Sequence, residues 1–243
     1  MIPITWMFLS ILPLNQLAEK IFERECGGKM EELTHWKRGE EFASLGIGHF
    51  IWYPNGKPDR FAETFPDLLD FIESRGKVLP PVLQKSRTCP WNSREEFYKN
   101  IESKEMMSLR SFLFETRDLQ ADFIAKRLDR SISNIISHVV ESDRKKIRET
   151  VDRLSSTSAG LYALIDYLHF KGEGTSPLET YQGQGWGLLQ VLCRLNPSSG
   201  TLLLDFISEA KIVLSARVAN APPERNEQQW RKGWLNRLDG YLK

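Results

Sequence analysis

The sequence predicts a mainly α-helical protein, an α+β fold in which a helical body carries one small β-hairpin. Three observations support this fold class. Apolar residues recur every three to four positions through most of the chain after residue 60, the period of one face of an α-helix. Aromatic and β-branched residues typical of strands are concentrated in residues 33–36 and 42–53. The chain has 243 residues, of which 41% are hydrophobic, enough to bury a core.

The first predicted helix begins after Asn15, whose side chain suits an N-terminal cap. Apolar residues then recur at helical spacing as far as Phe22. Gly27 and Gly28 end the helix, because glycine adopts the left-handed backbone that commonly follows a last turn.

The predicted hairpin follows directly. Its strands are residues 33–36 and 42–53, and the charged segment 37–41 is expected to form its tip. Gly46 and Gly48 alternate within the second strand, where the absence of a side chain lets a ligand or another backbone approach.

The remainder of the chain predicts helices separated by short turns. Ser93 and Glu96 have the spacing of a capping box, which starts a helix at residue 94. Residues 161–170 are apolar nearly all round, as expected of a buried helix. Further helices are expected at residues 67–75, 106–140 (two or three helices), 142–154, 201–218 and 223–241, with a short one opening near 185–190.

Charge and hydropathy limit the partners and the location of the chain. The 33 Lys and Arg residues balance 32 Asp and Glu residues, so no net field attracts nucleic acid, and we expect no nucleic-acid partner.

Residues 4–14 form an apolar run of eleven, too short to cross a bilayer and close in length to a signal-peptide core. We expect residues 1–14 to be an export signal or an N-terminal arm, residues 15–243 to be a single domain, and the protein to be periplasmic or extracellular.

Three cysteines cannot all pair with one another. Cys193 lies in an apolar run and is expected to be a buried thiol. Cys26 and Cys89 both lie beside turn residues, so a bridge between them is one alternative, which would suit an oxidising compartment, and reduced buried thiols are the other.

Glu25 stands at the end of the first predicted helix. The negative end of the helix dipole disfavours an ionised carboxylate there, which makes Glu25 a good candidate for a general acid. Glu40 and Glu41 lie in the predicted hairpin tip and are candidates for a second carboxylate. Glu40, next to Gly39, is preferred, and a solvated hairpin tip is the alternative.

The segment from residue 22 to residue 49 resembles the catalytic core of the lysozyme superfamily, in which a helix-ending glutamate precedes a small β-hairpin. Residues 44–49, Ser-Leu-Gly-Ile-Gly-His, are similar to the Thr-Ile-Gly-x-Gly-His run of phage-type muramidases. Residues 24–29, Arg-Glu-Cys-Gly-Gly-Lys, are loosely similar to the glutamate turn of goose-type lysozymes. The resemblance implies a lysozyme-like fold for the helical domain.

The same resemblance implies roles for individual residues. Glu25 takes the place of the general acid, and Ser44 stands where the phage-type family has a water-positioning Thr. Arg38 occupies the position six residues earlier where that family has an Asp, so the second carboxylate is left open, with Glu40 preferred over Glu41. His49 is assigned to substrate binding or to a hydrogen bond within the hairpin.

A second group of residues follows the buried helix. Residues 185–190, Gly-Trp-Gly-Leu-Leu-Gln, look like the Gly-Phe-Gly-Leu-Met-Gln segment of goose-type lysozymes and the Gly-Leu-Met-Gln motif of lytic transglycosylases. Glu173 precedes Gly187 by 14 residues, close to the transglycosylase spacing. Either Glu173 is the acid, or this loop is a second wall of the cleft, which we prefer, or it is only a Gly-rich connection between buried helices. The substrate-binding residues of that wall are Glu173, Gln182, Gln184, Trp186 and Gln190.

The sequence therefore predicts a bacterial, lysozyme-like glycosidase acting on the β-1,4 bond of peptidoglycan or a related amino-sugar polymer. A lytic transglycosylase, which needs only the glutamate, is one alternative. A non-catalytic glycan-binding module, favoured by Arg38, is another. We expect a monomer without a stable membrane span or cofactor. We also expect no metal site, since His35 and His49 have no third ligand at zinc spacing.

Overall fold

The computed structural model describes residues 14–54, 62–85 and 87–242, and over these ranges the protein is mainly helical, as predicted. Two small antiparallel sheets accompany the helices, where the sequence predicted a single hairpin. The chain divides into two compact units, an N-terminal unit of Pro13–Ile124 and a C-terminal unit that contains Ala125–Lys243. The sequence predicted one domain over residues 15–243. The predicted export signal or arm lies outside the described residues, apart from Leu14.

None of the helices in the described ranges has the length and hydropathy that crossing a bilayer requires.

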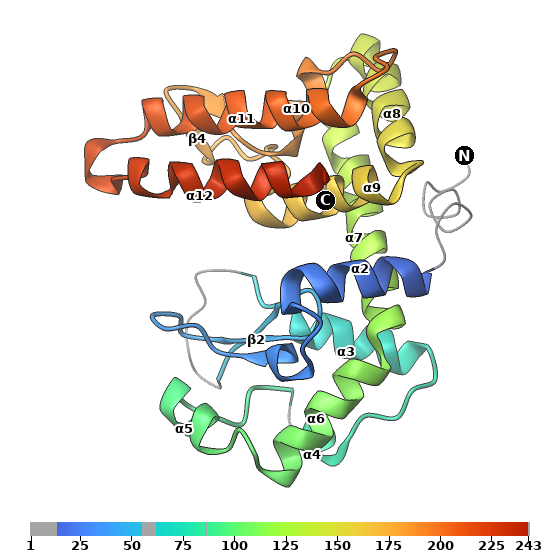
Figure 1. The fold of residues 1–243 in the computed structure, drawn as a ribbon, viewed down its shortest axis with the longest axis vertical. Coiled ribbons are helices and arrows are strands. Elements are labelled where there is room, and N and C mark those ends of the chain that lie inside the picture. Colours follow the sequence, from blue (N-terminus) through green and yellow to red (C-terminus); the bar gives the residue numbers. More distant parts are fainter. Residues whose placement is uncertain (1–13, 55–61, 86, 243) are drawn as a thin grey trace. The chain divides into compact units, whose positions relative to one another are not determined.

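The N-terminal unit combines a three-stranded sheet with short helices (Figure 1). The strands lie in the order β1-β2-β3, each antiparallel to its neighbour. Helix α7 (Arg117–Ser137) contributes its first residues to this unit and the rest to the other. The other elements are α2 (Leu14–Cys26), η1 (Met30–Leu33), β1 (Thr34–His35), β2 (Ala43–Leu45), β3 (Phe50–Trp52), α3 (Phe65–Ser74), α4 (Pro81–Lys85), α5 (Arg94–Lys99) and α6 (Lys104–Glu115).

The two faces of this sheet differ in burial, because successive side chains of a strand point to opposite faces. Leu45 is paired with Phe50, and both are fully buried. The other face carries His35, Ser44 and Ile51, which are aligned across the three strands by the register. His35 and Ile51 are only half-buried, so this second face is the one that solvent reaches.

The predicted second strand is in fact two strands joined by a tight turn. Residues 46–49 form that turn between β2 and β3, whereas the sequence predicted Gly46 and Gly48 at strand positions. Gly46 has φ +70°, and a Cβ built on it would lie 2.3 Å from Oε1 of Gln120 in α7. The same Oε1 accepts a hydrogen bond from the Ile47 amide at 2.9 Å. The buried Gln120 side chain thus holds the turn from a distant part of the chain.

Gly46→Ala is expected to destabilise the fold more than Gly28→Ala does. Both positions have positive φ, at +70° and +67°, so alanine is strained at either by about 1–2 kcal/mol. Only Gly46 adds a clash with Gln120, since no atom lies within 4 Å of the Cβ position at Gly28. Overpacking of this kind costs roughly 1–3 kcal/mol more. Urea unfolding of both variants measures the difference, and equal losses would show that the turn does not depend on Gln120.

Aromatic rings form much of the core of the N-terminal unit. Trp52 contacts Phe65 and Trp91, with ring centroids 4.9 and 6.2 Å apart. Phe97 lies between Trp91 at 5.3 Å and Trp36 at 5.8 Å. All five rings are buried, so these tryptophans stabilise the core and are not available to stack on a sugar.

The C-terminal unit consists of helices that surround α9 (Ser158–Lys171), with a two-stranded hairpin beside them. As predicted, α9 is buried along most of its length. The other elements are the later part of α7, α8 (Glu141–Ser155), β4 (Thr180–Tyr181), β5 (Gln184–Gly185), α10 (Leu188–Arg194), α11 (Leu202–Asn220), η2 (Pro223–Arg225), α12 (Gln228–Asp239) and η3 (Gly240–Leu242).

All three cysteines are free thiols. Cys26 and Cys89 are both buried, and the bridge considered between them is not formed. Burial raises the pKa of the Cys26 thiol to about 12, which leaves it unreactive at neutral pH. Cys193 is exposed, contrary to prediction, because α10 turns its neighbours Val191 and Leu192 inward instead.

Candidate active site

The end of α2 fixes the position of Glu25. The helix buries Ile21 and Phe22 on its inner face. It ends at Cys26, and the next two residues, Gly27 and Gly28, both have left-handed backbones. The Gly28 amide donates to the carbonyl of Phe22 at 3.3 Å, a bond that closes the last turn of a helix. Glu25 is therefore held in a terminated helical turn, as the sequence predicted.

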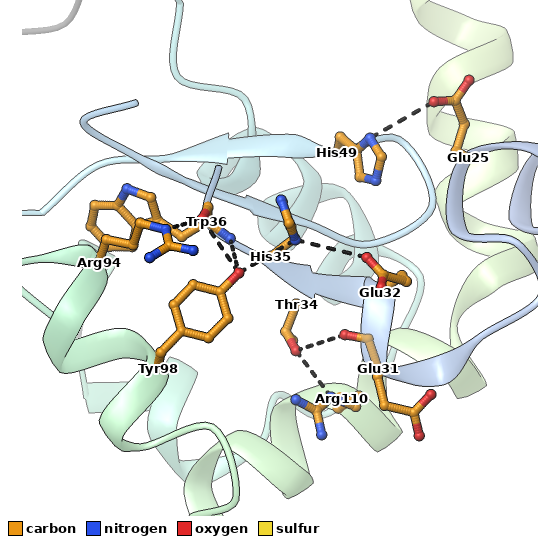
Figure 2. A network of polar contacts seen from close by, with 10 residues as sticks. All are labelled: Glu25, Glu31, Glu32, Thr34, His35, Trp36, His49, Arg94, Tyr98 and Arg110. Atoms are coloured by element: carbon orange, nitrogen blue, oxygen red, sulfur yellow. Dashed lines mark hydrogen bonds and ion pairs between the residues drawn. The ribbon is translucent and has the colours of Figure 1, made fainter. Parts of the chain in front are cut away.

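Glu25 faces His49 of the turn between β2 and β3 (Figure 2). The His49 Nδ1 atom lies 3.8 Å from the Glu25 Oε2 atom. The Glu25 side chain is 20% exposed and that of His49 is 31% exposed. The structure thus brings together two of the predicted site residues, and both remain accessible to solvent.

His49 has a left-handed backbone, with φ +46°, which is uncommon for a residue other than glycine. Its amide donates to the carbonyl of Gly46 at 3.2 Å, and the Gly46 amide donates to the carbonyl of Leu33 at 2.8 Å. These bonds, together with Gln120, determine the conformation of the turn. Strained residues held this firmly are often found at functional sites, and here the strained residue carries an ionisable ring toward Glu25.

Ser44 and Glu40 lie at different places relative to the Glu25–His49 pair. Ser44 is buried within β2, aligned with His35 on one side and Ile51 on the other. Glu40 precedes β2, and its carbonyl accepts a hydrogen bond from the Trp36 indole at 2.8 Å. The turn that carries His49 follows β2. Glu40 and that turn therefore lie at opposite ends of β2. The strand, which rises about 3.3 Å per residue, separates them.

The open face of the sheet carries a polar group that sequence reasoning missed. The His35 Nδ1 atom lies 3.4 Å from the Tyr98 hydroxyl and 3.8 Å from a carboxylate oxygen of Glu32 (Figure 2). The Arg94 guanidinium lies over the Tyr98 ring, 4.5 Å from its centroid, and donates to the carbonyl of Trp36. The capping box that starts α5 places these two residues, but nothing in the sequence links them to His35, about sixty residues earlier.

Glu173 of the C-terminal unit is tied to its own loop. Its carboxylate accepts hydrogen bonds from the side-chain amide of Asn134 and, at 3.3 Å, from the hydroxyl of Thr175. Its backbone carbonyl accepts from the Leu189 amide at 2.9 Å. These contacts join the end of α9 to α7 and to the start of α10.

Gln190 also acts within this loop. Its side-chain oxygen accepts from the Gly187 amide at 2.8 Å, and its side-chain nitrogen donates to the carbonyl of Gly174 at 3.0 Å. A Cβ on Gly187 would lie 2.2 Å from the Gly174 nitrogen. The two glycines therefore permit a close backbone approach that Gln190 then fixes, so both ends of the amide predicted to bind sugar are occupied in the loop itself.

The remaining predicted residues lie in and after the β4–β5 hairpin. Gln182 and Gly183 form its turn with φ +51° and +75°, as a two-residue hairpin turn requires. Gln182 and Gln184 are exposed, and Gln184 accepts a hydrogen bond from the Asn220 side chain at 3.2 Å. Trp186 is buried, with only 8% of its surface exposed, so it lies in the core and does not offer a sugar-stacking face.

No group of three or more His, Cys, Asp or Glu residues suited to a metal ion is found within the described ranges.

Comparison of the chain with models of protein families, with curated proteins and with solved structures finds no match.

Proposed function

We propose that the protein is a glycosidase that cleaves the β-1,4 bond of peptidoglycan or a related amino-sugar polymer, with Glu25 as general acid. The observation that carries the proposal is the contact between Glu25, at the end of α2, and the strained His49 at the turn of a small antiparallel sheet. A helix-ending glutamate beside such a sheet is what the resemblance to the lysozyme superfamily implies. Because the substrate lies outside the cytoplasmic membrane, the proposal includes export of the chain.

In this proposal the Glu25 carboxyl donates its proton to the glycosidic oxygen as the bond breaks. The donation leaves a carboxylate 3.8 Å from the His49 ring. The proposal requires that ring to be neutral beforehand, because a proton on it would favour the ionised form of Glu25. Ser44 lies in the strand that leads to the turn and is proposed to position water.

A lytic transglycosylase is the second candidate, and the position of Glu40 favours it. Hydrolysis by two carboxylates needs the second group across the scissile bond from the first, within about 10 Å. Glu40 lies at the other end of β2 from the turn that carries His49. A transglycosylase uses a hydroxyl of the substrate as the nucleophile and requires only the glutamate.

Digestion of purified peptidoglycan by the 243-residue chain tests the proposal. We expect soluble fragments, and mass spectrometry of their ends separates the two candidates. Hydrolysis adds one water per cleavage and leaves a reducing end, whereas transglycosylation adds none and leaves a 1,6-anhydro end. Binding to peptidoglycan without release of any fragment would contradict both and would instead support a non-catalytic binding module.

A further inference from the structure

The C-terminal unit contains two ion pairs with buried carboxylates, Arg217–Glu227 and Arg237–Asp166, and a third cation that has no carboxylate partner among the described residues. The Arg217 guanidinium donates two hydrogen bonds, at 2.8 and 2.7 Å, to the Glu227 carboxylate, which also accepts one from Tyr181. The Arg237 guanidinium likewise donates to both carboxylate oxygens of Asp166. Each arginine is therefore neutralised by its own acid.

Lys171, the last residue of α9, is the third cation. It is only 8% exposed. Its ammonium lies 3.3 Å from the centroid of the Trp234 ring and 3.9 Å from that of Phe170. Among the described residues, the contacts of this ammonium are with these rings and none is an ion pair with a carboxylate. Burial together with the charges of Arg217 and Arg237 lowers its pKa to about 7.

An aromatic surface adjoins the lysine. Trp230 is stacked on Trp234, with ring centroids 6.1 Å apart and an angle of 29° between the rings. Trp230 is 48% exposed, unlike the buried Trp186. Indole faces combine a large apolar area with little conformational freedom, which suits them to pack against the apolar face of a sugar ring.

We propose that Lys171 and the Trp230–Trp234 stack form a binding site for a sugar that carries a carboxylate. The three cations and two carboxylates of this cluster leave one positive charge, which matches a single carboxylate. A phosphate monoester carries about −1.5 to −2 at neutral pH and would call for a second free cation. The site belongs to the C-terminal unit and does not depend on catalysis at Glu25.

The charged groups around Lys171 set the expected pH dependence. Arg217 faces it from α11 and Arg237 from α12, while Glu227, at the start of α12, is the nearby acid that favours its charged form. Asp166, which lies on α9 like Lys171, accepts hydrogen bonds from Arg237 and from the Tyr241 hydroxyl. The arginines do not titrate near neutral pH, and burial lowers the pKa of His169 on the same helix as Lys171 below its ordinary value. A loss of affinity between pH 6 and pH 8 is therefore expected to follow the loss of the Lys171 proton.

Isothermal titration of the Glu25→Gln variant with monosaccharides tests the site, since these ligands have no glycosidic bond to cleave and the variant lacks the proposed general acid. N-acetylmuramic acid and N-acetylglucosamine form a matched pair of ligands that differ by a carboxylate-bearing group. We expect the acidic sugar to bind at least tenfold more tightly at pH 6. Its affinity should fall about tenfold between pH 6 and pH 8, because the competent, protonated fraction falls by that factor.

Variants at two positions complete the test. Lys171→Met is expected to remove the preference for the acidic sugar, and Trp230→Ala, at an exposed ring, to weaken binding of both sugars. Lys171→Arg keeps a charge that does not titrate, so its affinity should not change between pH 6 and pH 8. Equal binding of the two sugars, an unchanged preference in folded Lys171→Met, or tighter binding of a sugar phosphate would overturn the proposal.

Discussion

Replacing Glu25 by glutamine is expected to lower the rate of peptidoglycan cleavage by a factor on the order of a hundred or more, the usual contribution of a general acid. The amide keeps the shape of the side chain but has no proton of comparable acidity to donate. Glu25 lies at the end of α2, about one-fifth exposed, so the fold should tolerate the change. Release of soluble muropeptides measures the rate, and circular dichroism with thermal unfolding checks the fold.

Glu40→Gln is the matched control, because it makes the same chemical change at the other end of β2. We expect it to retain most of the activity. Glu173→Gln is the second control, in the loop that resembles the transglycosylase motif and is bonded to Asn134 and Thr175. If Glu173→Gln were inactive while Glu25→Gln kept the wild-type rate, the catalytic role would move to the C-terminal unit.

The elements that the sequence predicted well are those defined by local interactions. Ser93 was expected to cap α5, and its hydroxyl accepts a hydrogen bond from the Glu96 amide at 3.2 Å. The end of α2 at Gly27 and Gly28 was likewise predicted. Caps and glycine stops depend on residues within one helical turn, so a single sequence contains the whole signal.

The β2–β3 turn was missed because its cause is not local. The segment around Gly46 and Gly48 has the composition of a strand, and alternating glycines are compatible with one. What folds it into a turn is the buried side chain of Gln120, which binds the Ile47 amide from 73 residues away. A nonlocal contact of this kind leaves no periodic pattern in the sequence.

In the candidate site, too, features set by local sequence were predicted and features set by distant contacts were not. Glu25 and His49 were both predicted as site residues, but their contact depends on the turn that was missed. Trp186 was expected on the surface from its place in a glycine-rich motif. Its burial follows from packing against Tyr181, at 4.7 Å, and beneath Arg217, at 4.1 Å from its ring centroid. The cation comes from α11, about thirty residues later in the chain.

The burial of Lys171 was not predicted, because it too depends on a residue distant in the sequence. A lysine at the end of an apolar helix, followed by Gly172, suggests a solvated helix end. The structure instead encloses it between Phe170 and Trp234, and the second ring comes from the C-terminal helix. The burial of this charge should affect the pH dependence of the free energy of unfolding as well as ligand binding.

Lys171→Met is expected to stabilise the protein at pH 6 and to lose this advantage as the pH rises toward 10. The pKa of Lys171 is lowered in the folded chain from 10.5 to about 7. Between these values the unfolded chain binds more protons than the folded one, so the stability of the wild type rises with pH there and is lowest, with respect to this group, below pH 7. At 1.36 kcal/mol per pKa unit, the wild type should gain up to about 5 kcal/mol relative to Lys171→Met across this range. Urea unfolding at pH 6, 8 and 10 measures both proteins.

Two controls separate the effect of the buried charge from general effects of the substitution. Lys145 on α8 is 86% exposed, so Lys145→Met should leave the pH dependence of stability parallel to that of the wild type. Lys171→Arg keeps a cation that does not deprotonate in this range, so its cost of burial should persist up to pH 10. A constant difference between the wild type and Lys171→Met at all three pH values would mean that Lys171 titrates as a solvated lysine, because only a group whose pKa differs between the folded and unfolded chains changes stability with pH.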